Sequence, residues 1–357
     1  MDKNKNNKLK KTMYPIFVVL LFVLFIHMGI IGCVGNATQL QKNEPNKICG
    51  PSNETLSPDG KKVIFAKKKS SNGTIILAIH ELSTGKLYKL KPTTNDYHTD
   101  PVFSPDGKKI AFIAGKKNHS ENVFIANGDG TDVKQLTFNT DKYPENGGKY
   151  ATNKLPTFSP DGKKIIFVRS GVILTRATEM KANWDVFEVD ILTGAERRLT
   201  NYRLFIINRP QFMPDGRRFL FSGDNFSKQY KGKYGENQIY LMNHASTELK
   251  PAFVYGDRTF APSVDRDGNI VFLAGVNHVD KVKGPYMCDV FIMKKGEILR
   301  LTQKKYSEPV LRPFISYDGS RILFRACTKD GLGSQLWIMN NDGTGLTEVK
   351  IDYAALD

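Results

Sequence analysis

The segment Phe103-Ser-Pro-Asp-Gly-Lys-Lys-Ile-Ala-Phe112 recurs with variations along most of the chain. Its first half has the chemistry of a tight turn, because proline presets φ, aspartate bonds back to the backbone and glycine adopts a positive φ. Its second half is an apolar run suited to a buried strand. A helix would not need Pro-Asp-Gly directly before its apolar residues, so the segment predicts a β-hairpin.

Six copies of this hairpin are present, with successive turn aspartates 47 to 55 residues apart. These aspartates are Asp59, Asp106, Asp161, Asp215, Asp267 and Asp318. The apolar strand that follows each turn contains a phenylalanine: Phe65, Phe112, Phe167, Phe221, Phe272 and Phe324. Self-similarity at a fixed period of this length is typical of solenoids and propellers.

Each repeat provides four short strands in about 50 residues, which is too little apolar surface for independent stability. Six such sheets packed radially bury their faces against each other and protect their edges. We therefore predict an all-β fold over residues 49–357, a six-bladed β-propeller of four-stranded antiparallel blades, rather than a repetitive β-sandwich. Ring closure is expected to pair Leu346–Ile351 with about Ile48–Leu56, or to place both in one blade. Pro144–Lys154 and Gly171–Trp184 read as long loop insertions.

The N-terminus has the pattern of an export signal. A lysine-rich start precedes the 18 apolar residues Tyr14–Ile31, which indicates a secretory signal over residues 1–32. The sequence Ile30-Ile-Gly-Cys33 is similar to a bacterial lipobox, in which the cysteine takes a diacylglycerol before cleavage. We expect lipidation at Cys33, a polar tether over residues 33–48, and a location on the outer side of a bacterial membrane. An uncleaved transmembrane anchor is the alternative.

The composition, with 40% hydrophobic and 25% charged residues, is that of an ordinary globular protein and excludes global disorder. A net charge of +16 suits anionic lipids or acidic wall polymers. The lysines, however, occur largely as pairs in the repeat turns, which favours a solvated surface. An exported protein rarely meets nucleic acid, so we expect no nucleic-acid partner, and we expect a monomer.

The repeats resemble the PD40 repeat of TolB-type propellers, which reads F-S-P-D-G-K-x-I-A-F and, later, I-Y-x-M-N-x-D-G-T. Phe103–Phe112 and Trp337–Thr344 match this pattern closely, and the resemblance covers roughly residues 50–351. Fewer than 20 residues lie between Cys33 and the first repeat. The resemblance therefore implies a TolB-like propeller lipoprotein without the α/β domain that precedes the propeller in TolB.

Two enzyme classes have propellers of similar repeats. Prolyl-oligopeptidase-like enzymes need a hydrolase domain with G-x-S-x-G, and this motif does not occur in the chain. Oligogalacturonate lyases use a histidine-rich metal site in the channel. The histidines after the leader form no HxH or HxxxH pair: His80, His98, His119, His244 and His278. We expect no catalytic residue, cofactor or metal, and we read Asn127–Asp132 as a turn rather than a calcium loop, because it lacks the closing glutamate.

Propellers bind ligands at the channel mouth and on the loops of one face. In this repeat family, the residue just before the first strand's proline points toward the channel. The expected binding residues there are Asn53, His98, Asp100, Arg209 and Arg312. Ion pairing among these residues is the alternative to ligand binding. Tyr230 and Tyr234, in a lysine-rich loop, suit contact with a peptide or an acidic glycan.

Three cysteines follow Cys33, in a compartment that permits disulfides. A bridge between Cys49 and Cys327 is conceivable, but three buried small residues are the favoured interpretation. Taken together, the sequence predicts a non-enzymatic propeller that mediates protein or cell-envelope interactions. The alternative is a channel-centred lyase or hydrolase that acts on an acidic saccharide.

Overall fold

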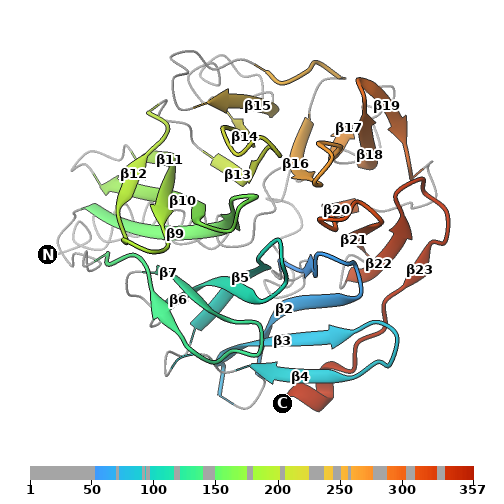
Figure 1. Ribbon diagram of the computed structural model, residues 1–357, viewed down its shortest axis with the longest axis horizontal. Coiled ribbons are helices and arrows are strands. Elements are labelled where there is room, and N and C mark those ends of the chain that lie inside the picture. The colour runs from blue at the N-terminus through green and yellow to red at the C-terminus, as the bar shows by residue number, and fades with distance from the viewer. Residues whose placement is uncertain are drawn as a thin grey trace, which may run out of the picture.

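The computed structural model describes residues 53–69, 72–90, 93, 97–115, 121–139, 149–174, 180–201, 206–224, 237–243, 251–255, 259–275, 288–302, 310–327 and 334–357. Within these ranges, six antiparallel sheets stand around a common axis, one after another along the chain (Figure 1). The predicted six-bladed β-propeller is confirmed. The predicted signal, the tether, Cys33 and Cys49 lie outside the described residues.

In each blade the strands run from the centre outward in chain order. Blades one and two contain β1 (Thr55–Leu56), β2 (Lys62–Lys68), β3 (Ile75–Glu81), β4 (Leu87–Leu90), β5 (Tyr97–Phe103), β6 (Lys109–Gly115), β7 (Asn122–Asn127) and β8 (Lys134–Gln135). Blades three and four contain β9 (Lys149–Phe158), β10 (Lys164–Leu174), β11 (Met180–Asp190), β12 (Glu196–Arg198), β13 (Ile206–Phe212), β14 (Arg218–Asp224) and β15 (Gln238–Asn243). Blades five and six contain β16 (Thr259–Val264), β17 (Ile270–Gly275), β18 (Cys288–Lys294), β19 (Glu297–Arg300), β20 (Val310–Ile315), β21 (Arg321–Cys327), β22 (Ser334–Asn340) and β23 (Thr347–Glu348).

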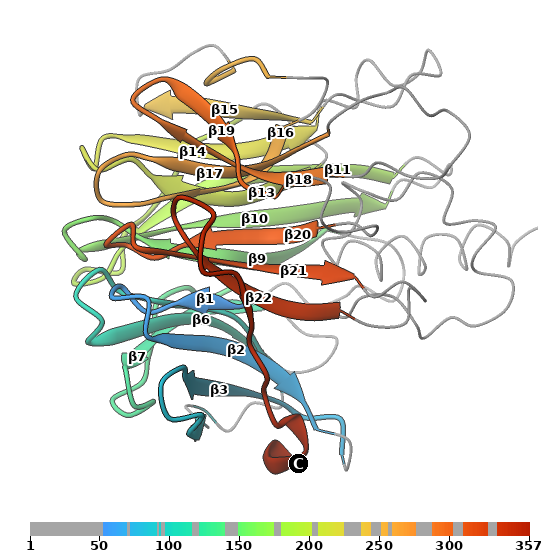
Figure 2. The ribbon, with the colours of Figure 1, turned by 90° about the vertical axis from the view of Figure 1, so that its right-hand side faces the viewer.

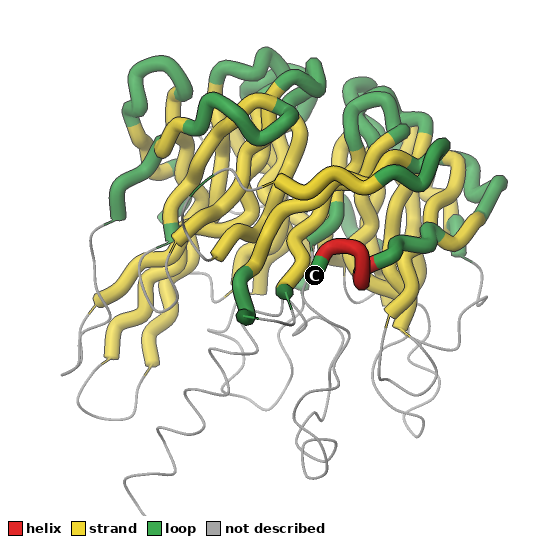
Figure 3. The backbone as a smooth tube through the Cα atoms, turned by 90° about the horizontal axis from the view of Figure 1, so that it is seen from below, coloured by secondary structure: helices red, strands yellow, loops and turns green. Residues whose placement is uncertain are grey.

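Blades three and four depart from the regular pattern. Where the structure describes them, the segments expected as loop insertions in blade three are instead strand: β10 is paired as far as Lys149↔Ile173 with β9 and as far as Leu174↔Met180 with β11. Figures 2 and 3 show these strands projecting from one face of the ring. In blade four the described residues form three strands, and a bridge between Tyr240 and Pro251 stands at the place of the fourth.

The Asp-Gly hairpins form as the turn chemistry predicts, and all six turns lie at the same end of the blades. Their glycines have φ between 63° and 83°, which only glycine adopts at low cost. In blade two, Asp106 Oδ1 accepts hydrogen bonds from Ser104 Oγ at 2.6 Å and from Lys108 N at 3.0 Å. We call this end of the ring the turn face.

The core lies between neighbouring blades. All six phenylalanines of the apolar strands after the turns have no exposed surface. Between blades one and two, for example, Ile64 and Leu77 pack with Phe103 and Phe112. A fully buried phenylalanine stabilises a fold by roughly 1.5–3 kcal/mol relative to an exposed one. The repeated aromatic is therefore the main contact by which one blade holds the next.

The ring closes without a shared blade. β1 pairs with β2 in blade one and β23 pairs with β22 in blade six, so the expected pairing of the two chain ends is wrong. Instead, the backbone N–H of Asp318 donates to Pro58 O at 2.9 Å, and the segment after β23 packs on blade one. The 3₁₀ helix Tyr353–Leu356 carries the buried Leu356, and the Tyr353 ring stands edge-on to Phe65 at 5.7 Å.

Two further features bear on the predictions from sequence. Cys288 is buried, as expected, but Cys327 is disulfide-bonded, so the interpretation of Cys327 as an unbridged residue is wrong. In the part of the chain that the structure describes, no helix is both long and apolar enough to cross a membrane.

Candidate functional site: the central channel

The innermost strands share a β-bulge next to the channel. Five residues that precede the inner-strand prolines adopt left-handed φ values of 43° to 54°: Asp100, Leu155, Arg209, Ala261 and Arg312. The strand register shifts at the same places. A residue before proline normally stays extended, and non-glycine residues seldom have positive φ. Such strained positions persist only where the surrounding structure holds them, and they often lie at functional sites.

The bulges bring most of the predicted binding residues together. Asn53 Nδ2 donates to Asp100 Oδ1, and Asp100 Oδ2 accepts from the backbone N–H of Leu155 at 3.0 Å. Asn53, Asp100 and Arg209 line one small cavity at the centre of the ring. The remaining lining comes from Thr55, Pro101, Val102, Leu155, Pro156, Thr157, Gln211 and Phe314. Three of the predicted binding residues thus lie together, the aspartate is held by neutral donors, and their role in binding stays a prediction.

Arg209 reaches across the channel. Its Nη1 donates to Pro313 O of blade six at 2.7 Å, and its guanidinium carbon lies 5.7 Å from the centre of the Phe314 ring. The side chain is only 6% exposed, and its Nη2 has no hydrogen-bond partner. Burial, reinforced by the nearby Arg312, lowers the pKa of Arg209 to about 10, although Glu54 and Asp100 act in the opposite direction. Arg209 remains a cation at neutral pH.

A buried ion pair that local patterns did not reveal lies beside this cluster. Glu54 of blade one accepts from Arg325 Nη2 of blade six, and Arg325 also donates to Ser334 Oγ at 2.7 Å. Burial lowers the pKa of Arg325, but the attraction of Glu54 outweighs it and the pKa is raised. Burial also lowers the pKa of Arg312, against the attraction of Glu54 and Asp100. The only local signal was the position of Glu54, directly after Asn53.

His98 does not join the channel cluster. Its Nδ1 lies 2.9 Å from Ile75 O in blade one and its Nε2 lies 2.7 Å from Thr93 Oγ1, and the ring is fully buried against Phe112. The placement of His98 at the channel mouth is therefore wrong. The bulge between Thr99 and Val102 adds one residue to the strand, so side chains on its two sides no longer follow one alternation.

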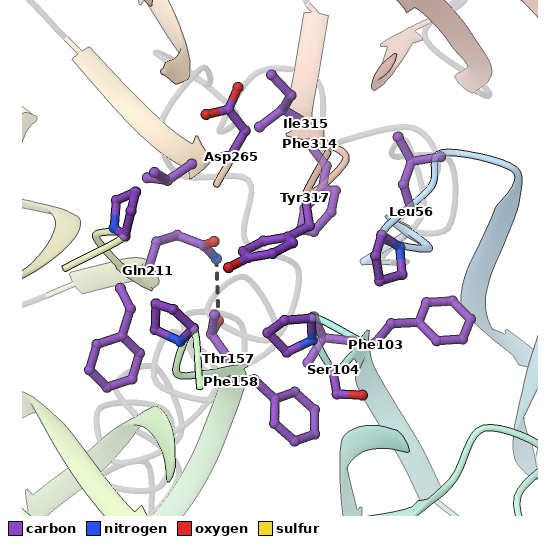
Figure 4. Close-up of a pocket in the computed structure, with 17 residues that line it drawn as sticks. Leu56, Phe103, Ser104, Thr157, Phe158, Gln211, Asp265, Phe314, Ile315 and Tyr317 are labelled. Carbon is purple, nitrogen blue, oxygen red and sulfur yellow. Dashed lines mark hydrogen bonds between the residues drawn. The ribbon is translucent and has the colours of Figure 1, made fainter. Parts of the chain in front are cut away.

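A second pocket lies on the turn-face side of the channel. It shares Val102, Thr157, Gln211 and Phe314 with the inner cavity. Figure 4 shows Tyr317 pointing across it toward Gln211 and Thr157, which are joined by a 3.2 Å hydrogen bond. Rigid proline rings from four turns complete the wall of this pocket: Pro58, Pro105, Pro160 and Pro214. We call these four prolines together with Tyr317 the collar. The sequence analysis treated these prolines only as turn formers.

The remaining predicted contacts cannot be placed. Tyr230 and Tyr234 lie outside the described residues, as do His119, His244 and His278. Among the residues that are described, no group of three or more His, Cys, Asp or Glu side chains could hold a metal ion. The described part of the channel presents guanidinium groups, neutral hydrogen-bonding side chains and apolar proline rings.

Comparison with proteins of known sequence places this geometry in context. The chain is 28% identical to the Tol-Pal system protein TolB of Francisella tularensis over 203 residues, which is 55% of this chain and 41% of that protein. The match therefore spans less than half the length of the curated TolB relative. The chain resembles TolB. No protein-family model matches it.

Solved structures agree with this likeness at the level of the fold. TolB from Acinetobacter baumannii superimposes with a TM-score of 0.55 at 19% identity, over 80% of this TolB-like chain and 63% of that one. An oligogalacturonate lyase solved in complex with manganese gives a TM-score of 0.53 at 14% identity, over 84% of this chain and 76% of the lyase. At these identities the likeness shows a shared propeller fold, which both a Tol-Pal protein and an enzyme use.

Proposed function

We propose that this chain is a non-enzymatic, TolB-like propeller lipoprotein that binds another protein of the cell envelope. The observation that carries the proposal is the sequence match to a Tol-Pal system protein, which coincides with a propeller channel that opens through an apolar collar. We further propose that the protein is a monomer on the outer side of a bacterial membrane.

The collar has the properties of a protein-binding surface. Proline rings and the Tyr317 ring present apolar area on elements that are already rigid, so binding costs little conformational entropy. Tyrosine is also enriched where interfaces concentrate their binding energy.

In-cell photocrosslinking tests the protein-binding role. In one variant a photoreactive phenylalanine analogue replaces Tyr317, which lines the collar pocket. In the control variant the same analogue replaces Leu192, which is 87% exposed on the β11–β12 turn. We expect an envelope protein to be captured from position 317 and not from position 192, as read by mass spectrometry. Identical captured proteins at both positions, or none at 317, would refute the proposal.

The lipid anchor has its own test. Cys33, in the lipobox-like Ile30-Ile-Gly-Cys33, is the proposed acceptor of the diacylglycerol. Cells that express the wild type should incorporate radiolabelled palmitate into the protein, and Cys33→Ala should abolish the label. Label that persists in Cys33→Ala would rule out this anchor and leave the collar experiment unaffected.

A second candidate is a channel-centred enzyme that acts on an acidic saccharide. The buried Arg209 and the half-buried Arg312 favour it, because guanidinium groups recognise carboxylates. Purified protein is incubated with pectic fragments and manganese or calcium. New unsaturated product would support a lyase and new reducing ends without it a hydrolase, and a lack of both would end this alternative.

A further inference from the structure

The turn face carries an open groove between blades one and two, which we call the side groove. Its volume is about 660 Å³, which lies within the range of ligand-binding pockets. Ile79 and Leu90 of blade one and Phe103 of blade two line it with apolar side chains that belong to the core of this junction. Tyr88, which is 37% exposed, forms part of the same wall. The groove therefore presents core-like apolar surface to solvent.

A glycine accounts for this opening. In four blades the residue directly after the third strand donates its backbone N–H to a carbonyl in the hairpin of the same blade. This residue is Gly128 in blade two, and its counterparts in blades one, three and six are Leu82, Ile191 and Asn341. Leu82 and Ile191 are half-buried and pack against the hydrophobic core. Blade two places no side chain at this position, so the space beside Gly128 stays open.

The junction between blades two and three shows what fills such a space. Ile191 of blade three packs on the core there, and Lys134 Nζ of blade two donates to Ile191 O at 2.9 Å. An aliphatic side chain and a lysine that binds the main-chain carbonyl of the same residue thus act together. The side groove has the apolar surface and the lysines, Lys62 and Lys89, but lacks the aliphatic side chain.

The blade-two wall of the side groove carries negative charge. Asp106 and Asp129 line this wall, and both are exposed. The hydroxyls of Ser104 and Thr131 hold the pKa of these two carboxyls below its ordinary value, so both are anionic at neutral pH. A basic residue of a ligand is complementary to this wall. Because the carboxylates are exposed, such ion pairs add modestly to affinity, and burial of an aliphatic side chain must supply most of it.

We propose that the side groove is a docking site for an extended segment of a partner protein, which inserts one aliphatic side chain and places a lysine or arginine beside it against Asp106 and Asp129. The groove adjoins the collar, because Pro58 and Phe103 line both the groove and the collar pocket. This inference rests on the proposed protein-binding role, and it adds a second contact with a stated sequence preference.

Titration calorimetry with defined peptides tests the site on the purified protein. The probes are the capped peptides Gly-Lys-Ile-Lys-Gly, Gly-Lys-Gly-Lys-Gly and Gly-Glu-Ile-Glu-Gly, titrated to about 5 mM, which covers the weak affinity expected of a single inserted side chain. The Lys-Ile-Lys peptide should bind at least about tenfold more tightly than the peptide without isoleucine. It should bind at least about threefold more tightly than the glutamate peptide.

Gly128→Leu should close the groove from within. The counterpart positions already carry Leu82 and Ile191, and a Cβ at position 128 would lie 3.2 Å from Gly107 O, so only a small shift is needed. We expect the variant to weaken binding of the Lys-Ile-Lys peptide at least about tenfold. The matched control is Gly275→Leu in blade five, where an added Cβ meets no atom within 4 Å, and its affinity should equal that of the wild type.

A second pair of variants tests the charged wall and remains informative if Gly128→Leu does not fold. Asp129→Asn keeps an oxygen for the hydrogen bonds from Thr131 but removes the charge, and it should weaken the Lys-Ile-Lys peptide about two- to threefold. Asp342→Asn is the control, because Asp342 accepts the same two bonds from Thr344 in blade six and does not line the groove. Its affinity should be unchanged.

Four results would overturn the docking site: no binding of the Lys-Ile-Lys peptide, equal binding of the peptide without isoleucine, tighter binding of the glutamate peptide, or affinity that survives Gly128→Leu. Equal effects of Asp129→Asn and Asp342→Asn would contradict the preference for a basic residue. Crosslinking from Tyr317 does not depend on these peptides. A failure of the side groove and a failure of the protein-binding role of the collar therefore give different results.

Discussion

Serine hydroxyls link the Asp-Gly turns to the strands that follow them. In blade two, Ser104 Oγ donates to Asp106 Oδ1 at 2.6 Å and accepts from the backbone N–H of Lys109 at 2.9 Å. The same arrangement recurs at Ser57, Ser159 and Ser316. Blade four has Met213 at this position, and there Asp215 accepts from Arg217 and Arg218 instead. One hydroxyl thus links the turn aspartate to the start of the next strand.

Removing this hydroxyl should destabilise the protein. Ser104→Ala leaves the part-buried N–H of Lys109 without its acceptor and removes one of the two donors to Asp106 Oδ1, so we expect the free energy of unfolding to fall by about 1–2 kcal/mol in urea. Ser320→Ala is the control, because Ser320 also donates to its turn aspartate but is exposed. Its effect should stay within about 0.5 kcal/mol. Equal losses in both variants would contradict the bridging role.

The same bond predicts a pH dependence. The Ser104 hydroxyl, followed by the backbone N–H of Lys108, holds the pKa of Asp106 below its ordinary value of 3.8. A carboxyl whose pKa is depressed on folding contributes stability above its unfolded pKa and loses it as the pH falls through its folded pKa. The stability difference between wild type and Ser104→Ala should therefore shrink below about pH 4. A difference that is the same at pH 7 and pH 3 would refute this.

At the scale of the strand, the threonine of the recurring Leu-Thr dipeptide bonds the end of the outer strand to the third strand in several blades. Thr200 Oγ1 accepts from the backbone N–H of Val186 at 2.9 Å and donates to Asp185 Oδ1 at 3.0 Å. Thr302 makes the equivalent contacts with Val290 and Asp289. The threonine therefore ties the end of the outer strand to the start of the third strand, where its side chain is buried.

Thr200→Val tests this fastening. Valine keeps the shape of threonine but leaves the Val186 N–H and one Asp185 oxygen unsatisfied in a buried place. We expect a loss of about 2–3 kcal/mol in the free energy of unfolding. Thr347→Val, on the exposed outer strand of blade six, should change it by less than about 0.5 kcal/mol. Similar values for the two variants would mean that the Leu-Thr pattern has no bonding role.

At the scale of the whole molecule, the ring is held closed by side chains. Glu54 and Arg325 are 271 residues apart in sequence and join blade one to blade six, with side chains 2% and 10% exposed. The 3₁₀ helix after β23 covers the same seam through Tyr353 and Leu356. A ring closed in this way depends on a few buried contacts at one junction, whereas the other five junctions continue along the chain.

Glu54→Gln should destabilise the junction between blades one and six. Losing one partner leaves Arg325 as a buried charge without its carboxylate, so we expect a loss of about 3 kcal/mol in urea unfolding. The double variant Glu54→Gln with Arg325→Met should recover much of this loss, because no buried charge of the pair remains. Arg197→Gln, which removes the 53% exposed half of an ion pair, should cost less than about 1 kcal/mol. A Glu54→Gln loss no larger than that of Arg197→Gln would contradict this account of closure.

The number of blades, the hairpin turns, the buried phenylalanines and the proximity of Asp100 to Arg209 could all be read from the amino-acid order. Turn chemistry and strand alternation depend on residues that are close in sequence, and a local pattern that recurs six times can be recognised without a structure. The orientation of His98 could not be read, because a one-residue bulge reverses the facing of the strand. The Glu54–Arg325 ion pair and the hydrogen bond from Arg209 to Pro313 could not be predicted either. These contacts join blades that meet only when the ring closes, so their energies depend on distances that no spacing along the chain encodes.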